Sequence, residues 1–172
     1  MAPKSYQGVL AHAEEPRTYS QTPESNLAQD VITVADLLRE KGGIVYTIAP
    51  GETVRSAVHE LRARRIGVVL VMEEDGIVGI LSERDVVRRI DEAGDAGLDT
   101  PVSALMTPNP QTCNPSTPLL AVLRRMTDGR FRHLPVVEDG QLVGLVSIGD
   151  VVKARLRQLE YEALRMKQMI VG

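Results

Sequence analysis

Residues 79–87 read GILSERDVV, and residues 144–152 read GLVSIGDVV. Both stretches carry Gly, Ser, Asp and Val-Val at the same places, and 144 − 79 gives an offset of 65 residues. The offset continues without a gap through the segments that precede each stretch. A doubled pattern of this length predicts two copies of one structural unit.

Each copy predicts the order strand, helix, strand, strand, helix, from apolar periodicity and from turn residues between the apolar runs. In the first copy these elements are expected over residues 44–48, 53–65, 67–72, 77–81 and 82–90. In the second copy they are expected over residues 111–114, around 119–126, over 130–137 and 142–146, and from 147 onward. The run at 67–72 is continuous and rich in β-branched valine, which is typical of a strand covered on both faces.

One such unit is too short to bury both faces of its sheet. We therefore expect an α/β (α+β) fold in which two pseudo-twofold-related β-α-β-β-α repeats pack sheet to sheet. The expected organisation is a flexible N-terminal arm over 1–30, repeat 1 with a leading helix over 31–98, repeat 2 over 99–157, and a C-terminal helix extension over 158–172.

The extension continues an apolar heptad spacing that fits either packing on its own domain or a dimer contact. Its apolar positions are Leu156, Leu159, Ala163, Met166 and Ile170.

The composition limits the classes of protein that fit. With no Trp and one Phe, the core of this 172-residue chain must be aliphatic. A formal charge of −3 argues against a generally basic nucleic-acid binder. Cys113 is the only cysteine, so no internal disulfide is possible, in agreement with a reducing compartment. Without a membrane-length apolar run or a signal-peptide core, the expected protein is soluble and cytoplasmic.

The repeated Ser-x-x-Asp has two interpretations. It can be a helix capping box, in which the hydroxyl and the carboxylate satisfy backbone amides at the start of the helix. It can also be half of a binding site, because a carboxylate suits ribose hydroxyls and exposed helix amides suit a phosphate. The glycine three residues before each Ser would leave space over the strand end, and pseudo-twofold packing would pair the two sites.

The chain resembles a tandem pair of CBS (cystathionine-β-synthase) domains, also called a Bateman module, over roughly residues 44–157. The resemblance rests on Gly-apolar-apolar-Ser-x-x-Asp in both units, on Met106-Thr107, and on RHLPVV at residues 132–137. The segments 41–43 and 148–153 are similar to those of small bacterial proteins that consist of little besides this module.

The resemblance implies adenine-nucleotide binding in two clefts between the repeats. Asp85 and Asp150 would hold ribose hydroxyls, with Ser82 and Ser147 on the phosphate side. The cleft of Asp150 would be completed by Thr47, Ile48 and the backbone of Gly67, Val68 and Val69. The cleft of Asp85 would be completed by Thr112, Cys113, Arg132, His133, Leu134 and Pro135. Basic candidates for neutralising phosphates are Arg65, Arg84, Arg130, Arg132 and His133.

We expect a non-enzymatic regulatory module, because no nucleophile, base and orienting group fall together and no cluster has metal-ligand spacing. Its expected ligands are AMP, ADP, ATP or NAD, as regulators and not as cofactors of catalysis. The family implies a homodimer, with no membrane partner and an unidentified protein target. The alternative is a structural or protein-interaction module whose Ser-x-x-Asp motifs are only helix caps. A weaker alternative is nucleic-acid binding through the arginines.

Overall fold

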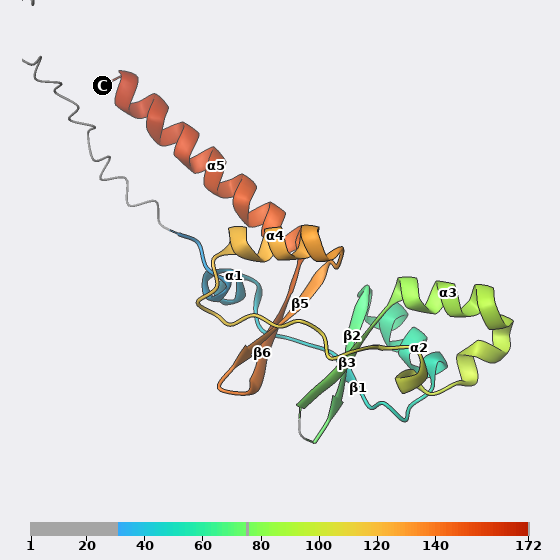
Figure 1. Cartoon of the computed structure of the whole chain (residues 1–172). Coiled ribbons are helices and arrows are strands. Elements are labelled where there is room, and N and C mark those ends of the chain that lie inside the picture. Colours follow the sequence, from blue (N-terminus) through green and yellow to red (C-terminus); the bar gives the residue numbers. More distant parts are fainter. Residues whose placement is uncertain (1–30, 75, 172) are drawn as a thin grey trace, which may run out of the picture. The chain divides into compact units, whose positions relative to one another are not determined.

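The computed structural model describes residues 31–74 and 76–171, so the arm expected over 1–30 lies outside the described residues. The elements follow in the order α1 (Val34–Lys41), β1 (Thr47–Ile48), α2 (Val54–Arg64), β2 (Val68–Glu73), β3 (Gly76–Ser82), α3 (Glu83–Ala93), η1 (Gly94–Asp99), η2 (Val102–Ala104), β4 (Thr107–Pro108), α4 (Leu119–Gly129), β5 (His133–Glu138), β6 (Gln141–Ser147) and α5 (Ile148–Val171) (Figure 1). The β-α-β-β-α order is therefore confirmed in repeat 1, and its α-β-β-α part recurs in repeat 2.

Two small sheets carry the fold. The first has the order β1-β2-β3-β4, with β1 parallel to β2 and the other pairs antiparallel. The second consists of the hairpin β5–β6, and Cys113 makes a single parallel bridge to Val136. The sheets meet where β3 contacts β6. The mixed α/β fold with paired sheets agrees with the expectation, whereas the strand expected over 111–114 is reduced to that one bridge.

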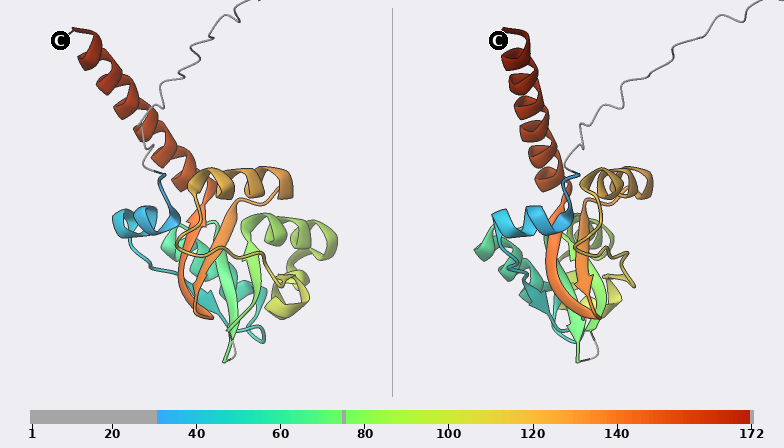
Figure 2. Two further views of the ribbon diagram at one scale, coloured as in Figure 1. Left: turned by 60° about the vertical axis from the view of Figure 1, so that its left-hand side comes forward. Right: turned by 90° about the vertical axis from the view of Figure 1, so that its left-hand side faces the viewer.

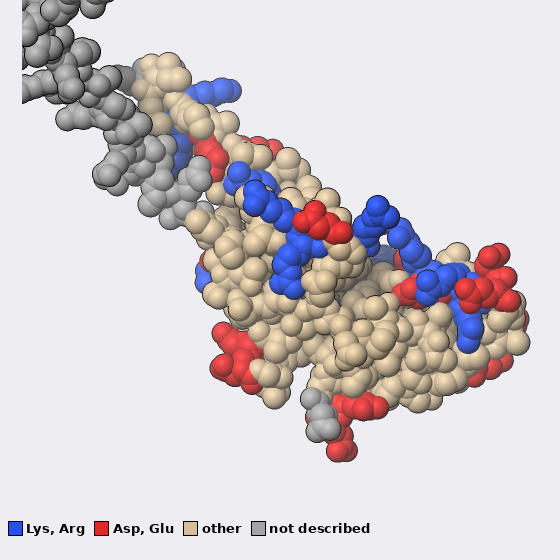
Figure 3. Space-filling view, viewed as in Figure 1, with Lys and Arg blue, Asp and Glu red and all other residues tan. Residues whose placement is uncertain are grey.

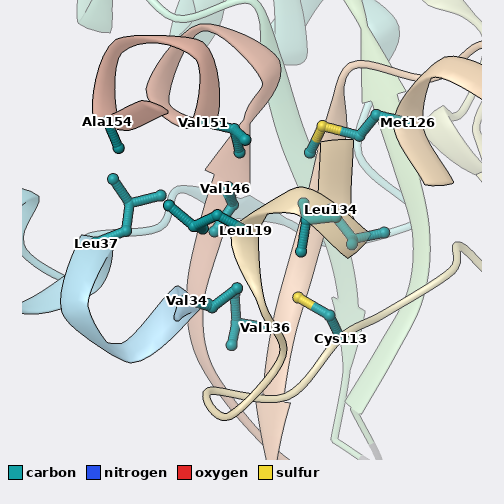
Figure 4. Packing of buried hydrophobic residues seen from close by; sticks show 11 residues of the cluster. Val34, Leu37, Cys113, Leu119, Met126, Leu134, Val136, Val146, Val151 and Ala154 are labelled. Atoms are coloured by element: carbon teal, nitrogen blue, oxygen red, sulfur yellow. The ribbon is translucent and has the colours of Figure 1, made fainter. Parts of the chain in front are cut away.

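Each repeat builds its own apolar core, and the two cores match position by position. Ile48, Val69 and Leu81 in the first core correspond, 65 residues on, to Cys113, Leu134 and Val146 in the second. Figure 4 shows the second core, in which side chains of α4, α5, β5 and β6 converge. Val68 is also buried but belongs to neither core, because alternate residues of β2 point to opposite faces. The strand covered on both faces is thus confirmed.

The leading segments pack on the opposite repeat. Val34 and Leu37 of α1 precede repeat 1 in the sequence but are buried in the core of repeat 2 (Figure 4). Val102 and Leu105, which precede repeat 2, are buried in the core of repeat 1. Backbone hydrogen bonds fix both crossings, from Val34 N to Thr117 O at 3.0 Å and from Val102 N to Glu52 O at 2.7 Å. The leading helix thus lies within the sequence range of repeat 1 and packs in the core of repeat 2.

The repeated glycines leave room for side chains of the crossing segments. A Cβ on Gly144 would stand 2.7 Å from Leu38 Cδ2, and a Cβ on Gly79 would stand 2.3 Å from Met106 Sδ. The space that we expected over each strand end is therefore filled by the side chain of a leading segment. Gly79 and Gly144 serve packing between chain segments, and they leave no vacant space at the motif.

Three further departures from the expected elements have local causes. The first-repeat helix runs on to Ala93, and the short helix η1 follows it within the expected connector. The strand pairing of repeat 2 begins at His133, because Arg130 adopts a left-handed conformation (φ 55°) that ends α4. The last helix is one uninterrupted helix of 24 residues, and its C-terminal half projects from the rest of the fold (Figure 2).

Candidate functional site

Both copies of Ser-x-x-Asp form complete hydrogen-bonded caps. In the first, the Ser82 hydroxyl donates to Asp85 Oδ2 at 2.6 Å and Ser82 N donates to the same oxygen at 3.0 Å. In the second, the Ser147 hydroxyl and backbone N donate to Asp150 Oδ2 at 2.7 and 3.0 Å. The amide of each Asp in turn donates to the Ser oxygen. The capping-box interpretation is thus physically realised in both copies.

A third box of the same geometry lies outside the repeated motif. At the start of α1, the Thr33 hydroxyl and backbone N donate to Asp36 Oδ2 at 2.8 and 2.9 Å. The hydrogen bonds from Thr33 N and from that hydroxyl hold the pKa of Asp36 below its usual value. Asp36 therefore provides an internal comparison for what a cap alone contributes.

The two repeated carboxylates differ in their cationic partners. Asp150 Oδ2 accepts a hydrogen bond from Lys41 Nζ at 2.6 Å, and Lys41 is the last residue of α1. Asp85 Oδ1 instead pairs with Arg88 of its own helix at 3.4 Å. Lys41 reaches the site because α1 packs on repeat 2. No sequence signal could have found this contact directly, since Lys41 and Asp150 are 109 positions apart.

Arg132 and His133 lie beside Asp150. His133 pairs with Ser147 in the β5–β6 register, and Ile148 N donates to Arg132 O at 2.8 Å. The pair adjoins the start of α5 because β5 runs next to β6, the strand that leads into this helix. We expected this basic pair to complete the cleft of Asp85, and that assignment stays a prediction. The second-repeat site thus gathers one carboxylate and three basic side chains.

The pKa values of His133 and Asp150 depend on burial and on the other groups of this cluster. Burial lowers the pKa of His133 from its ordinary 6.5, the Asp150 carboxylate opposes that change, and the charges of Lys41 and Arg132 add to it. Burial by itself would raise the pKa of Asp150, but the hydrogen bonds from Lys41 and Ser147 outweigh it and hold the pKa below 3.8. Near neutral pH the cluster therefore has an ionised Asp150 and favours a neutral His133.

The first-repeat site lacks this basic pair. Val68 pairs with Ser82, and Glu83 N donates to Gly67 O at 3.1 Å, so Gly67 and Val68 occupy the places of Arg132 and His133. The side chain of Asp85 is 17% exposed, against 30% for Asp150. Arg84 is exposed at the start of α3. The two sites therefore share the cap and differ in the charge around it.

Most of the remaining predicted site residues have buried side chains, so a ligand would contact mainly their backbone atoms. Ile48, Val69, Leu134 and Cys113 are buried core side chains. Burial raises the pKa of the Cys113 thiol, which fits the expected role as a small core residue. Pro135 is buried, whereas Thr47 and Thr112 are exposed beside β2 and β5 respectively. Their contact with a ligand stays a prediction.

The turn ends of the two hairpins are acidic. Figure 3 shows acidic side chains at the turn ends of β2–β3 and β5–β6, whereas basic side chains lie over the helices together with some acidic ones. Glu73, Glu138 and Asp139 belong to the acidic ends. An anionic ligand is therefore better accommodated at the helix starts, where the caps and the basic cluster lie.

Comparison with known proteins identifies the family. A family model described as the CBS domain matches residues 34–92 and 102–157, which is more than half of the chain. The chain belongs to the CBS domain family. Each matched segment contains one repeat together with the leading segment that precedes it in the sequence, so the protein contains a tandem CBS pair.

Several CBS proteins are similar over most of this length. The mitochondrial CBS domain-containing protein CBSX3 of Arabidopsis thaliana is 34% identical over 149 residues, which span 81% of this chain and 72% of the relative. A CBS-domain protein of Agrobacterium tumefaciens is 42% identical, with a TM-score of 0.70, over 72% of this chain and 99% of the solved one. A CBS domain protein from Pyrobaculum aerophilum, solved in complex with AMP, is 28% identical with a TM-score of 0.62, over 69% and 89% of the two chains.

Neither a metal centre nor a membrane-spanning helix occurs in the described part of the chain. Within residues 31–74 and 76–171, no three His, Cys, Asp or Glu side chains gather as they would around a metal ion. None of the helices in these two ranges has the length and apolarity needed to span a membrane.

Proposed function

We propose that this CBS pair is a non-enzymatic regulatory module that binds an adenine nucleotide, with the main site at Ser147 and Asp150. AMP, ADP, ATP and NAD are the candidate ligands. Support comes from the AMP complex of the related Pyrobaculum aerophilum protein and from the doubled motif. Binding between the repeats would alter their relative geometry or rigidity, and a partner protein would respond to that change.

The cluster around Asp150 is the observation that carries the proposal. An ionised carboxylate accepts hydrogen bonds from vicinal ribose hydroxyls, and Lys41, Arg132 and His133 provide donors for a phosphate. The N-terminal end of α5 adds the positive end of a helix dipole. Lys41 donates to Asp150 Oδ2 in this structure, so a bound ribose would take over that oxygen and release the ammonium toward the phosphate.

The proposed affinities of the two sites differ. The Asp85 site has Gly67 and Val68 where the Asp150 site has Arg132 and His133, and its cationic partner is the exposed Arg88. Because phosphate binding depends on cationic donors, the Asp150 site is expected to bind more tightly. Isothermal titration should then show either one site or two unequal sites per chain.

Titration of the purified protein with AMP, ATP and NAD tests the proposal. Asp150→Ala should abolish the tighter binding, and Asp150→Asn should weaken it while keeping a capping acceptor. Asp36→Ala is the matched control, since it removes an equivalent cap outside the repeated motif and should leave the affinity unchanged. No heat from any of the three nucleotides would contradict the proposal.

The second candidate function is a protein-interaction module whose Ser-x-x-Asp motifs only cap helices. The complete hydrogen bonding of all three boxes favours it. It predicts that Asp36→Ala, Asp85→Ala and Asp150→Ala each lower the free energy of unfolding by about 0.5–2 kcal/mol, with no other effect. A nucleotide present at a concentration of about a hundred times its Kd would instead raise stability by about 2.7 kcal/mol, and Asp150→Ala would remove that gain.

A further inference from the structure

The C-terminal helix α5 presents an apolar stripe that no other described residue buries. Beyond Ala154, none of the side chains of α5 within the described range is buried. The large members of the stripe are between 42% and 83% exposed. The stripe consists of Val152, Leu156, Leu159, Ala163, Met166 and Ile170.

The spacing of this stripe is that of a coiled coil. Its members follow one another at intervals of four, three, four, three and four residues, which places them at successive a and d positions. The buried residues Val151 and Ala154 use another face of α5 to pack in the core of repeat 2. Because a helical segment with few tertiary contacts is only marginally stable in water, the projecting half of α5 needs a partner along the stripe.

The charges beside the stripe indicate what that partner is. With Leu156 at an a position, Arg155 and Glu162 fall at g, and Glu160 and Lys167 fall at e. In a parallel pair of identical helices, each g residue faces the e residue five positions later in the other helix. Arg155 then faces Glu160 of a second copy, and Glu162 faces Lys167. Both of these pairs join opposite charges.

An antiparallel pair has the opposite property. In the antiparallel register that places Leu156 opposite Met166 of the second copy, Glu160 lies close to Glu160 of that copy. The same register brings Glu162 close to Glu162. Like charges at these positions disfavour this antiparallel register, whereas the parallel register with the same overlap pairs opposite charges.

We propose that α5 is a self-association helix, which pairs in parallel and in register with α5 of a second copy of this chain through the stripe from Val152 to Ile170. The proposal is independent of nucleotide binding. It places two CBS pairs at the same end of a short two-stranded coiled coil, with their α5 helices alongside each other.

Disulfide trapping tests the orientation. Ile170→Cys puts a thiol in the last a layer, where a parallel dimer brings the two copies of this position together and oxidation should link them. In the antiparallel register this position would face residue 152, and its two copies would stand about 27 Å apart along the helix. Gln168→Cys, on the outer face, and the native chain, whose Cys113 is buried, are the controls. Equal cross-linking at 168 and 170, or none at 170, would overturn the proposal.

A charge exchange tests the partner. Arg155→Glu alone sets a carboxylate at position 155 against Glu160 of the second copy, and Glu160→Arg alone sets a second guanidinium against Arg155. Each variant should dimerise several-fold more weakly than the native chain, as expected for exposed ion pairs. An equal mixture should recover the native affinity as heterodimers, measured by sedimentation velocity. Unchanged dimerisation of both single variants would contradict the proposed pairing.

Disruption of the stripe tests whether dimerisation depends on it. Leu159→Glu changes an exposed side chain, so the fold and thermal unfolding of the monomer should be retained. The dimer dissociation constant should rise about tenfold or more, because an unpaired charge would have to enter the apolar seam, while Gln168→Glu on the outer face leaves it unchanged. A native chain that stays monomeric at all concentrations, or a Leu159→Glu dimer of native affinity, would refute the role of α5.

Discussion

Arg65 and Arg130 occupy the same position in the two repeats, one residue beyond α2 and α4, and both have a φ of 55°. A side chain raises the energy of this left-handed conformation by about 1–2 kcal/mol, whereas glycine adopts it freely. Both arginines are exposed, so little packing is lost on their removal.

We therefore expect Arg65→Gly and Arg130→Gly each to raise the free energy of unfolding by about 0.5–1 kcal/mol, after the greater flexibility of glycine in the unfolded chain is subtracted. Urea unfolding with an unchanged m value measures the effect. Arg62→Gly, inside α2, should instead lower stability by about 1 kcal/mol. The expectation fails if all three substitutions destabilise alike.

His133 should make stability depend on pH. Because burial lowers its pKa below 6.5, the unfolded chain takes up a proton more readily than the folded one. The contribution of His133 is therefore fully present above about pH 6.5, and it is lost as the pH falls toward the folded-state pKa. Asp150, Lys41 and Arg132 are the charged groups that modulate it.

Chemical unfolding between about pH 7.5 and 5 should show a decline in stability that His133→Gln flattens. His59→Gln is the control, because the His59 side chain is exposed on α2. A decline of native steepness in His133→Gln would assign the pH dependence to other groups.

At the scale of elements, the close contact between α1 and β6 predicts a coupled pair of substitutions. Gly144→Ala forces its Cβ against Leu38, and such overpacking costs about 1–3 kcal/mol. Truncation of the opposing side chain by Leu38→Ala should relieve part of that cost in the double mutant. The double-mutant cycle measures the coupling by urea unfolding.

Gly51→Ala is the control for this cycle, because a Cβ at Gly51 would meet no atom within 4 Å. Its effect should be small and additive with Leu38→Ala. Additivity of Gly144→Ala with Leu38→Ala would show that the contact with Leu38 does not account for the glycine.

The elements themselves could be predicted from the sequence, but their neighbours could not. Thr33, Asp36 three residues later, and Gly42 mark the two ends of α1 in the sequence, because capping signals are local. They leave open which core covers the apolar face of the helix. The position of His133 next to Ser147 likewise follows from the β5–β6 register, which spacing alone does not state. Its assignment to the cleft of Asp85 stays a prediction.

For the whole molecule, the crossed leading segments predict where local unfolding occurs. Val34→Ala removes buried volume from the second core and should cost about 1–3 kcal/mol. Hydrogen exchange should then accelerate mainly in β5 and β6. Val102→Ala should accelerate exchange mainly in β2 and β3, because Val102 belongs to the first core.

If α1 packed in the core of repeat 1, Val34→Ala would instead accelerate exchange mainly in β2 and β3. Equal acceleration in both hairpins after either substitution would contradict the expectation as well. Amide exchange followed by mass spectrometry distinguishes the three outcomes at the level of single strands.

The paired organisation of the molecule was accessible because the 65-residue offset preserves eight core positions, among them the pairs Leu61 and Met126, and Val86 and Val151. The exchange of leading segments was not accessible, since it requires contacts between residues far apart in the chain. The candidate site was predicted as motifs, whereas Lys41 joined it only through that exchange.

The crossing of α1 also sets the order of events on the ribosome. The first core can close as soon as Leu105 has emerged, because every buried side chain it needs has then been made. Val34 and Leu37 emerge earlier than any of these, but their core includes Ala154. At ordinary synthesis rates α1 therefore waits on the order of ten seconds with its apolar face uncovered. Among the helices of residues 31–74 and 76–171, the first to be translated therefore waits longest for its core.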